Sequence, residues 1–169
     1  MGPDGGKVSD QELTRILNEI VKVEGPLHIE LAAHRLAYAL GFQRVGNRVR
    51  EAVNRSIRNL LREEAIKRVN KFLWPNKDDF NLVVRQPLFK EKESYRPIKF
   101  VSPEEIELAI KNLICAALSI PEEDIIREVA RIFGFDRIGA NISDRLKKII
   151  HQMISRGDLV FKGDRISLP

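Results

Sequence analysis

The sequence contains one phrase twice, as GFQRVGNRVREAV at residues 41–53 and as GFDRIGANISDRL at residues 134–146. Both copies keep Gly-Phe, then an arginine, an aliphatic residue and a second glycine, and both continue into an apolar run at helical spacing. The copies begin at Gly41 and Gly134, 93 residues apart. The chain therefore carries an internal repeat, and the extent of that repeat decides the fold.

The repeat extends well beyond the two phrases. Sliding the chain against itself by 93 residues aligns apolar positions spaced three or four apart, which is the pattern of a buried helix face. The aligned pairs include Leu13 with Ile106, Leu17 with Ile110, Leu36 with Val129, Ile57 with Ile150 and Ile66 with Leu159. These pairs predict a duplicated fold unit.

Each copy is predicted to contain three helices. Ser9 with Glu12 and Ser102 with Glu105 match the capping box that starts a helix, and Pro103 suits the first helical position. Glycines 41 and 134 fall where a left-handed residue ends a helix, so the following Phe42 and Phe135 are expected to tuck beneath the turn. The predicted helices cover about 9–24, 29–40 and 47–63 in the first copy and 102–118, 122–133 and 140–156 in the second.

A β-hairpin is predicted after each third helix. The segments AIKRVNKFLWP at 65–75 and DLVFKGDRISLP at 158–169 alternate apolar and polar residues around a polar tip. Three helices followed by a hairpin is the winged form of helix-turn-helix. The expected fold class is therefore mainly α with small β-hairpins, in two tandem winged helix-turn-helix units packed together.

The domain organisation follows from the repeat. We expect a flexible leader over 1–8, the first unit over 9–85, a connector over 86–101 and the second unit over 102–169. Residues 82–84 are candidates for an extra strand on the first hairpin. Tyr95, Ile98 and Phe100 are too apolar for a free linker, so we expect them to pack between the units, since domains this small bury little surface alone.

The chain resembles a domain of unknown function found at the C-terminal end of large prokaryotic proteins. Those proteins carry a superfamily-one helicase core and often a nuclease-like domain. The matching stretches are VEGPLHIELAAHRLA, GFQRVGNRVREAV, FLWP, SPEEIELAI and GFDRIGANI. The resemblance implies an accessory module of a DNA-processing protein and brings no activity of its own. The sequence holds no phosphate-binding G-x-x-x-x-G-K-[ST] motif, so the helicase chemistry is not assigned to these residues.

Basic residues gather on the predicted third helices and hairpin tips. The third helix of a helix-turn-helix unit usually enters the major groove, so its outward face is expected to be basic. Glu51 and Arg55 are spaced to form an ion pair on this face of the first unit. The predicted nucleic-acid-binding residues are Arg48, Arg55, Arg58, Arg62, Lys67, Arg68 and Lys71 in the first unit and Lys147, Lys148, His151, Lys162 and Arg165 in the second.

Two interpretations of these charges stay open. The first is a non-catalytic module that binds duplex or branched DNA, which the formal net charge of +5 favours. The alternative is a docking module that joins the parent's helicase or nuclease domains or a partner protein, with basic faces that only solvate the helices. Arg44 and Arg137 either contact phosphates or have a structural role, in which they cover the phenylalanines or bond the carbonyls that end the second helices. Their retention in both copies, while the groove-facing residues differ, favours the structural role.

No catalytic, metal or cofactor site is predicted, so the chain is not expected to be an enzyme. The three histidines lack the spacing of metal ligands, and first-turn acids such as Glu105 suit the helix dipole. Cys115, the single cysteine, is expected to be buried, and Trp74 is expected to anchor the hairpin in preference to stacking on a base. One cysteine and the lack of a membrane-length apolar stretch indicate a cytoplasmic protein without a membrane partner.

Overall fold

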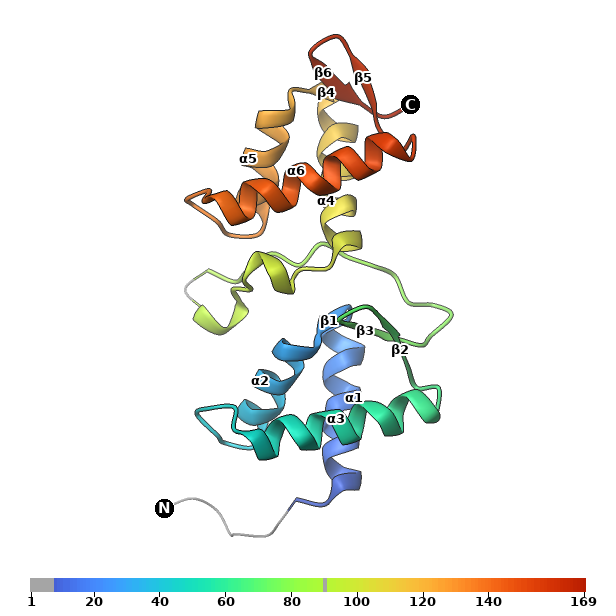
Figure 1. Ribbon diagram of the computed structural model, residues 1–169, viewed down its shortest axis with the longest axis vertical. Helices are drawn as coiled ribbons and strands as arrows, with labels where there is room; N and C mark the ends of the chain where they lie inside the picture. Colours follow the sequence, from blue (N-terminus) through green and yellow to red (C-terminus); the bar gives the residue numbers. More distant parts are fainter. Residues whose placement is uncertain (1–7, 90) are drawn as a thin grey trace. The chain divides into compact units, whose positions relative to one another are not determined.

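The computed structural model describes residues 8–89 and 91–169, apart from the side chain of Glu93 (Figure 1). It divides between Asn81 and Leu82 into two compact units, called unit 1 and unit 2 below. Of the leader predicted over residues 1–8, only Val8 lies within the described residues. The chain is mainly α-helical with small β-hairpins, as the sequence predicted.

Both units have the same order of elements. Unit 1 contains α1 (Asp10–Glu24), β1 (Leu27–His28), α2 (Ile29–Ala39), α3 (Asn47–Arg62), β2 (Ile66–Val69) and β3 (Phe72–Pro75). Unit 2 begins with the 3-10 turns η1 (Lys92–Ser94) and η2 (Ile98–Phe100), followed by α4 (Pro103–Ala117), β4 (Ser119–Ile120), α5 (Glu122–Ile132), α6 (Ala140–Ser155), β5 (Val160–Lys162) and β6 (Arg165–Ser167). The predicted helices and hairpins agree with these bounds to within one or two residues.

Each unit closes with a three-stranded antiparallel sheet in the order β1-β3-β2 or β4-β6-β5. The hairpin strands were predicted, but β1 and β4 were missed. Each of these two strands is only two residues long, and each pairs with the last strand of its hairpin, Leu27 opposite Leu73 and Ile120 opposite Ile166. A two-residue strand gives too little alternation to detect, so its pairing partner becomes visible only in the structure.

The repeated phrase forms the turn between the second and third helices. Gly41 and Gly134 adopt left-handed backbone angles, with φ of 76° and 83°. In each copy the glycine amide and the next amide bond back to carbonyls of the preceding helix, as in Phe42 N–H to the Ala37 carbonyl at 2.9 Å. This pair of hydrogen bonds is a Schellman motif, which ends a helix and satisfies its last carbonyls.

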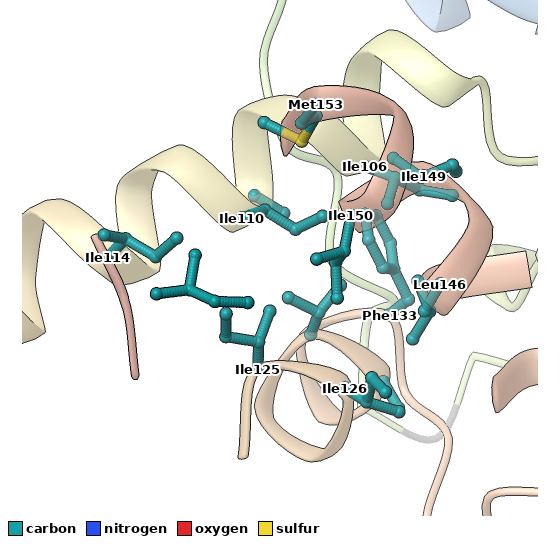
Figure 2. Packing of buried hydrophobic residues seen from close by; sticks show 14 of the residues in the cluster. Ile106, Ile110, Ile114, Ile125, Ile126, Phe133, Leu146, Ile149, Ile150 and Met153 are labelled. Atoms are coloured by element: carbon teal, nitrogen blue, oxygen red, sulfur yellow. The ribbon is translucent and has the colours of Figure 1, made fainter. Parts of the chain in front are cut away.

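Each unit has its own hydrophobic core, formed by the apolar positions that the repeat aligns. Figure 2 shows Ile106 and Ile110 of α4, Ile125 of α5 and Ile150 of α6 meeting inside unit 2. The corresponding positions of unit 1, including Leu17, Leu36 and Ile57, are buried as well. The 93-residue offset therefore aligns buried residues with buried residues in two separate cores.

Two predictions about buried side chains were wrong. Phe42 was expected under its turn but is 54% exposed, whereas Phe135 at the same position of unit 2 packs against the core. Cys115 was expected to be buried and is exposed, because it sits on the outer side of α4 near the solvent-facing Leu118. An apolar neighbourhood in the sequence therefore did not predict burial of Cys115, and the repeated turn did not predict burial of Phe42.

The segment before α4 belongs to unit 2, which differs from the predicted connector over 86–101 and from the predicted first unit that ended at residue 85. Ile98 and Val101 are buried in the core of unit 2. Residues 82–84 form no strand. The segment is therefore a structural part of the second unit, which explains its apolar content.

A buried ion pair fastens this segment to α4. The Glu105 carboxylate is 0% exposed and accepts hydrogen bonds from Arg96 at 2.7 and 2.8 Å and from Arg85 at 3.1 Å. Burial alone would raise the pKa of Glu105, but the bonds and charges of the two arginines outweigh it and lower that pKa. The Glu105 side chain was predicted to take part in the capping box and to complement the helix dipole, and in the structure it holds the segment in place through Arg85 and Arg96.

Candidate nucleic-acid interface

The third helix of unit 1, α3, has one buried and one exposed side. Val53, Ile57 and Leu60 point into the core, as does Ser56, which bonds Thr14 of α1. The opposite side is exposed along its whole length and carries four of the five α3 arginines at the positions predicted to face outward, namely Arg48, Arg55, Arg58 and Arg62. These outward arginines, together with the hairpin tip, form the candidate interface of unit 1.

Acidic residues of neighbouring helices hold two arginines of α3. Arg55 bonds both oxygens of Asp10 in the first turn of α1, at 3.1 and 3.2 Å. Arg50 bonds Glu30 in the first turn of α2 at 2.7 Å. The pair expected between Arg55 and Glu51 along the helix is replaced by the pair with Asp10, because α1 runs beside α3 and presents its first turn to Arg55.

Other arginines of α3 keep their charge available. Arg48 and Arg58 are exposed and have no polar partner within residues 8–89 and 91–169. Arg62 donates to the neutral side-chain oxygen of Asn59 at 3.2 Å, so its positive charge stays uncompensated. A phosphate can approach these three guanidinium groups without first displacing a carboxylate.

The hairpin tip of unit 1 adds further cations. Lys67 on β2 and Lys71 between the strands are exposed, and neither lysine has a polar partner in the described part of the chain. Arg68 donates to the carbonyl of Asn70 at 2.9 Å, which orders its side chain along the tip, and it has no acidic partner among the residues described. Asn70 has a left-handed φ of 54°, as short hairpin turns require.

Arg44 and Arg137 lie in the turns that precede α3 and α6. Both are exposed, and neither has a polar partner among the residues that the structure describes. The carbonyls near the end of α2 accept instead from the amides of Gly41 and Phe42. The proposed bonding of these arginines to helix-end carbonyls is therefore not found, and Arg44 joins the free cations next to the start of α3.

The third helix of unit 2, α6, has a weaker basic face. Lys147 and Lys148 are exposed and lack polar partners in the described ranges, as the sequence predicted. His151 lies 3.1 Å from a carboxylate oxygen of Glu122 on α5. Arg145 at the flank is half-buried and donates to the Val101 carbonyl at 2.8 Å, so it serves the fold. Two lysines therefore remain as free cations on this helix.

The hairpin of unit 2 contributes two cations that have no acidic partner in the described residues. Lys162 is exposed without a polar partner inside the described part of the chain. Arg165, also predicted to contact phosphate, donates to the hydroxyl and the carbonyl of Ser119 at 3.0 and 2.6 Å, so its side chain is ordered while its charge has no acidic partner in the described part of the chain. These bonds tie β6 to the start of β4, since Ser119 lies at the edge of the same small sheet.

Other kinds of site find no support in the described residues. No group of three or more histidine, cysteine, aspartate or glutamate side chains gathers there in a way that could hold a metal ion. None of the helices is both long and apolar enough to cross a membrane, within the part of the chain described. Trp74 packs edge-on against Phe80 with ring centres 5.8 Å apart, which supports its anchoring role in the hairpin.

A family described as a protein of unknown function, DUF3320, matches residues 7–51. This stretch takes in α1, β1, α2 and the beginning of α3, so it includes the first copy of the repeated turn. No curated protein and no solved structure matches the chain. The family match agrees with the domain of unknown function that the sequence resembles.

Proposed function

We propose that each unit is a winged helix-turn-helix and that the chain is a non-catalytic DNA-binding accessory module of a helicase- or nuclease-like protein. The order of three helices, an early strand and a final hairpin supports the winged-helix assignment. The association with a helicase or nuclease rests on the sequence resemblance. The observation that carries DNA binding is the outward face of α3, where Arg48, Arg58 and Arg62 have no acidic partner in the described residues.

Unit 1 is the principal binding unit in this proposal. Its α3 contains five arginines and one acidic residue, and the nearby turn and hairpin tip add Arg44, Lys67, Arg68 and Lys71. Unit 2 offers Lys147, Lys148 and Lys162, which suits a supporting contact to the backbone. Cations of this kind neutralise phosphates and give binding with little dependence on base sequence.

The two units are not equivalent in what they present. At the 93-residue offset, Arg58 corresponds to His151 and Arg62 corresponds to Ser155. The core positions Val53, Ile57 and Leu60 of α3, by contrast, correspond to Leu146, Ile150 and Met153 of α6, and all six are apolar and buried. Two units with one scaffold and different outward residues would not read the same bases, so we propose that they contact successive stretches of a duplex or the two arms of a branch.

A triple reversal on α3 tests the proposal. Replacement of Arg48, Arg58 and Arg62 by glutamate should remove most of the affinity for a fluorescent duplex, measured by anisotropy at low salt. The matched control reverses Arg15, Arg127 and Arg131, three exposed arginines that already pair with an acid three residues earlier on their own helices. Both variants change the net charge by the same amount, so equal losses would show a general charge effect and contradict an interface on α3.

The competing function is a docking module for the parent's other domains or for a partner protein. Its specific support is the exposed aromatic pair Tyr38 and Phe42 at the end of α2, 73% and 54% exposed. A partner captured after nuclease treatment and retained at high salt would favour docking. A loss of capture under the same conditions would favour DNA, because phosphate contacts weaken steeply with salt.

A further inference from the structure

The repeat allows the two units to be compared position by position at one end of each. This end, called the turn end below, consists of the first turn of the first helix and the turn between the second and third helices. In unit 2 a segment from the same unit covers it. In unit 1 the equivalent residues are exposed. Because both units share one scaffold, unit 2 shows what the turn end of unit 1 is shaped to receive.

In unit 2 the cover is the segment before α4. A side chain placed on Gly134 would lie 2.5 Å from Pro87 and 3.0 Å from the ring of Tyr95, so these two residues press directly on the turn. Arg85 and Arg96 reach the buried Glu105 in the first turn of α4. The cover thus combines a proline and an aromatic on the turn with two arginines on the acid.

In unit 1 each corresponding position is open. Among the described residues, a side chain placed on Gly41 would meet nothing within 4 Å. Phe42 is 54% exposed where Phe135 packs against its core, and Val8 is 44% exposed where Val101 is fully buried. The Glu12 side chain is 43% exposed, and its ion pair within residues 8–89 and 91–169 is the one with Arg15 on the same helix.

We propose that the turn end of unit 1 is a docking site for an extended segment of a partner protein, with the chemistry of residues 85–96. An arginine of the segment would bond Glu12, and a proline and an aromatic would cover Gly41 and Phe42. Tyr38 beside them, 73% exposed, would extend the apolar contact. The open glycine, the aromatic pair and the accessible acid match this occupant in both shape and charge.

Glu12 is prepared for such a contact. Its carboxylate already binds a guanidinium, that of Arg15, through two bonds of 2.6 and 3.0 Å. The bond from Arg15 lowers the pKa of Glu12, so the group is ionised at neutral pH. An exposed ion pair three residues apart is weak, and an incoming arginine can share or replace it at little cost.

A synthetic peptide of residues 82–101 is the probe, labelled and titrated into the full chain while its anisotropy is followed. We expect saturable binding with a Kd of about 100 µM or tighter. The variant Phe42→Ser combined with Glu12→Gln should weaken it by at least about tenfold. The matched control is Glu19→Gln, which alters another glutamate of α1 in an i,i+3 pair of the same 2.6 Å length, and it should bind as the wild type does.

The location is checked by amide chemical shifts. Peptide binding should shift the resonances of Glu12, Gly41 and Phe42, and a peptide with glutamate in place of Arg85 and Arg96 should not. Binding that survives the double variant, or shifts confined to unit 2, would overturn the proposal, since the peptide would then have displaced the chain's own segment. Concentration-dependent self-association that Phe42→Ser abolishes would also overturn it, by assigning the surface to a second copy.

Discussion

Removing the Glu105 carboxylate is the sharpest test of how unit 2 is held together. In Glu105→Ala the guanidinium of Arg96, whose side chain is 6% exposed, would stay buried without its counter-charge. Loss of one partner of a buried ion pair costs about 3–5 kcal/mol. Arg96 keeps one hydrogen bond, to the Arg85 carbonyl at 2.8 Å, so we expect the lower end, about 3 kcal/mol.

That free energy is large for a unit of this size. A loss of 1 kcal/mol lowers the melting temperature of a 60–100-residue domain by about 4–8 °C, so unit 2 should melt at least roughly 12 °C earlier. Circular dichroism follows the helices of both units, whereas the fluorescence of the single tryptophan, Trp74, follows unit 1. The expected result is a large shift of the dichroism transition.

The repeat supplies the control for this experiment. Glu12 occupies the same repeat position in unit 1 and is exposed, so Glu12→Ala should leave unfolding nearly unchanged. If Glu105→Ala and Glu12→Ala shifted unfolding by similar amounts, burial of the pair would not be what stabilises unit 2. Retention of most stability in Glu105→Gln would instead show that the hydrogen bonds matter more than the charge.

Other predictions follow from the same contacts. The folded pKa of Glu105 lies below the ordinary 4.5, so its ionised form stabilises the fold above that pH. This stabilisation is lost as the pH falls through the folded pKa. The difference in unfolding free energy between wild type and Glu105→Ala should therefore shrink in an acid titration. The exposed Cys115 should react with a thiol reagent in the native protein about as fast as after unfolding, and protection would contradict its position. Phe135→Ala should lower the free energy of unfolding by more than about 1 kcal/mol, whereas Phe42→Ala should not. Urea unfolding measures both losses.

The helices and hairpins could be predicted because their signals are local. Capping residues such as Ser102, whose hydroxyl accepts from the Glu105 amide at 3.1 Å, and the left-handed Gly41 and Gly134 mark where helices begin and end. The repeat then doubled every signal. The apolar pairs aligned at 93 residues lie in both cores, so positions that are apolar in both copies predicted which residues are buried.

The state of individual charges could not be predicted in this way. The charge of Arg55 is paired by Asp10, 45 residues earlier, and the side chain of Arg165 is held by Ser119, 46 residues earlier. Such pairs form only when helices and strands are packed. The two copies of one position also differ, since Phe42 is exposed and Phe135 is partly buried against the core of unit 2.

In the proposed function, binding of DNA phosphates rests on the outward cations of α3 and its hairpin. It is tested most directly by the affinity of the full chain for a labelled duplex, measured across a range of salt concentrations. If about six phosphates are neutralised, the logarithm of the association constant should fall with the logarithm of salt at a slope near −5. Replacement of Arg48, Arg58 and Arg62 by glutamate should lower the affinity and make this slope shallower. Absence of binding at low salt, or affinity that does not change with salt, would contradict the claim.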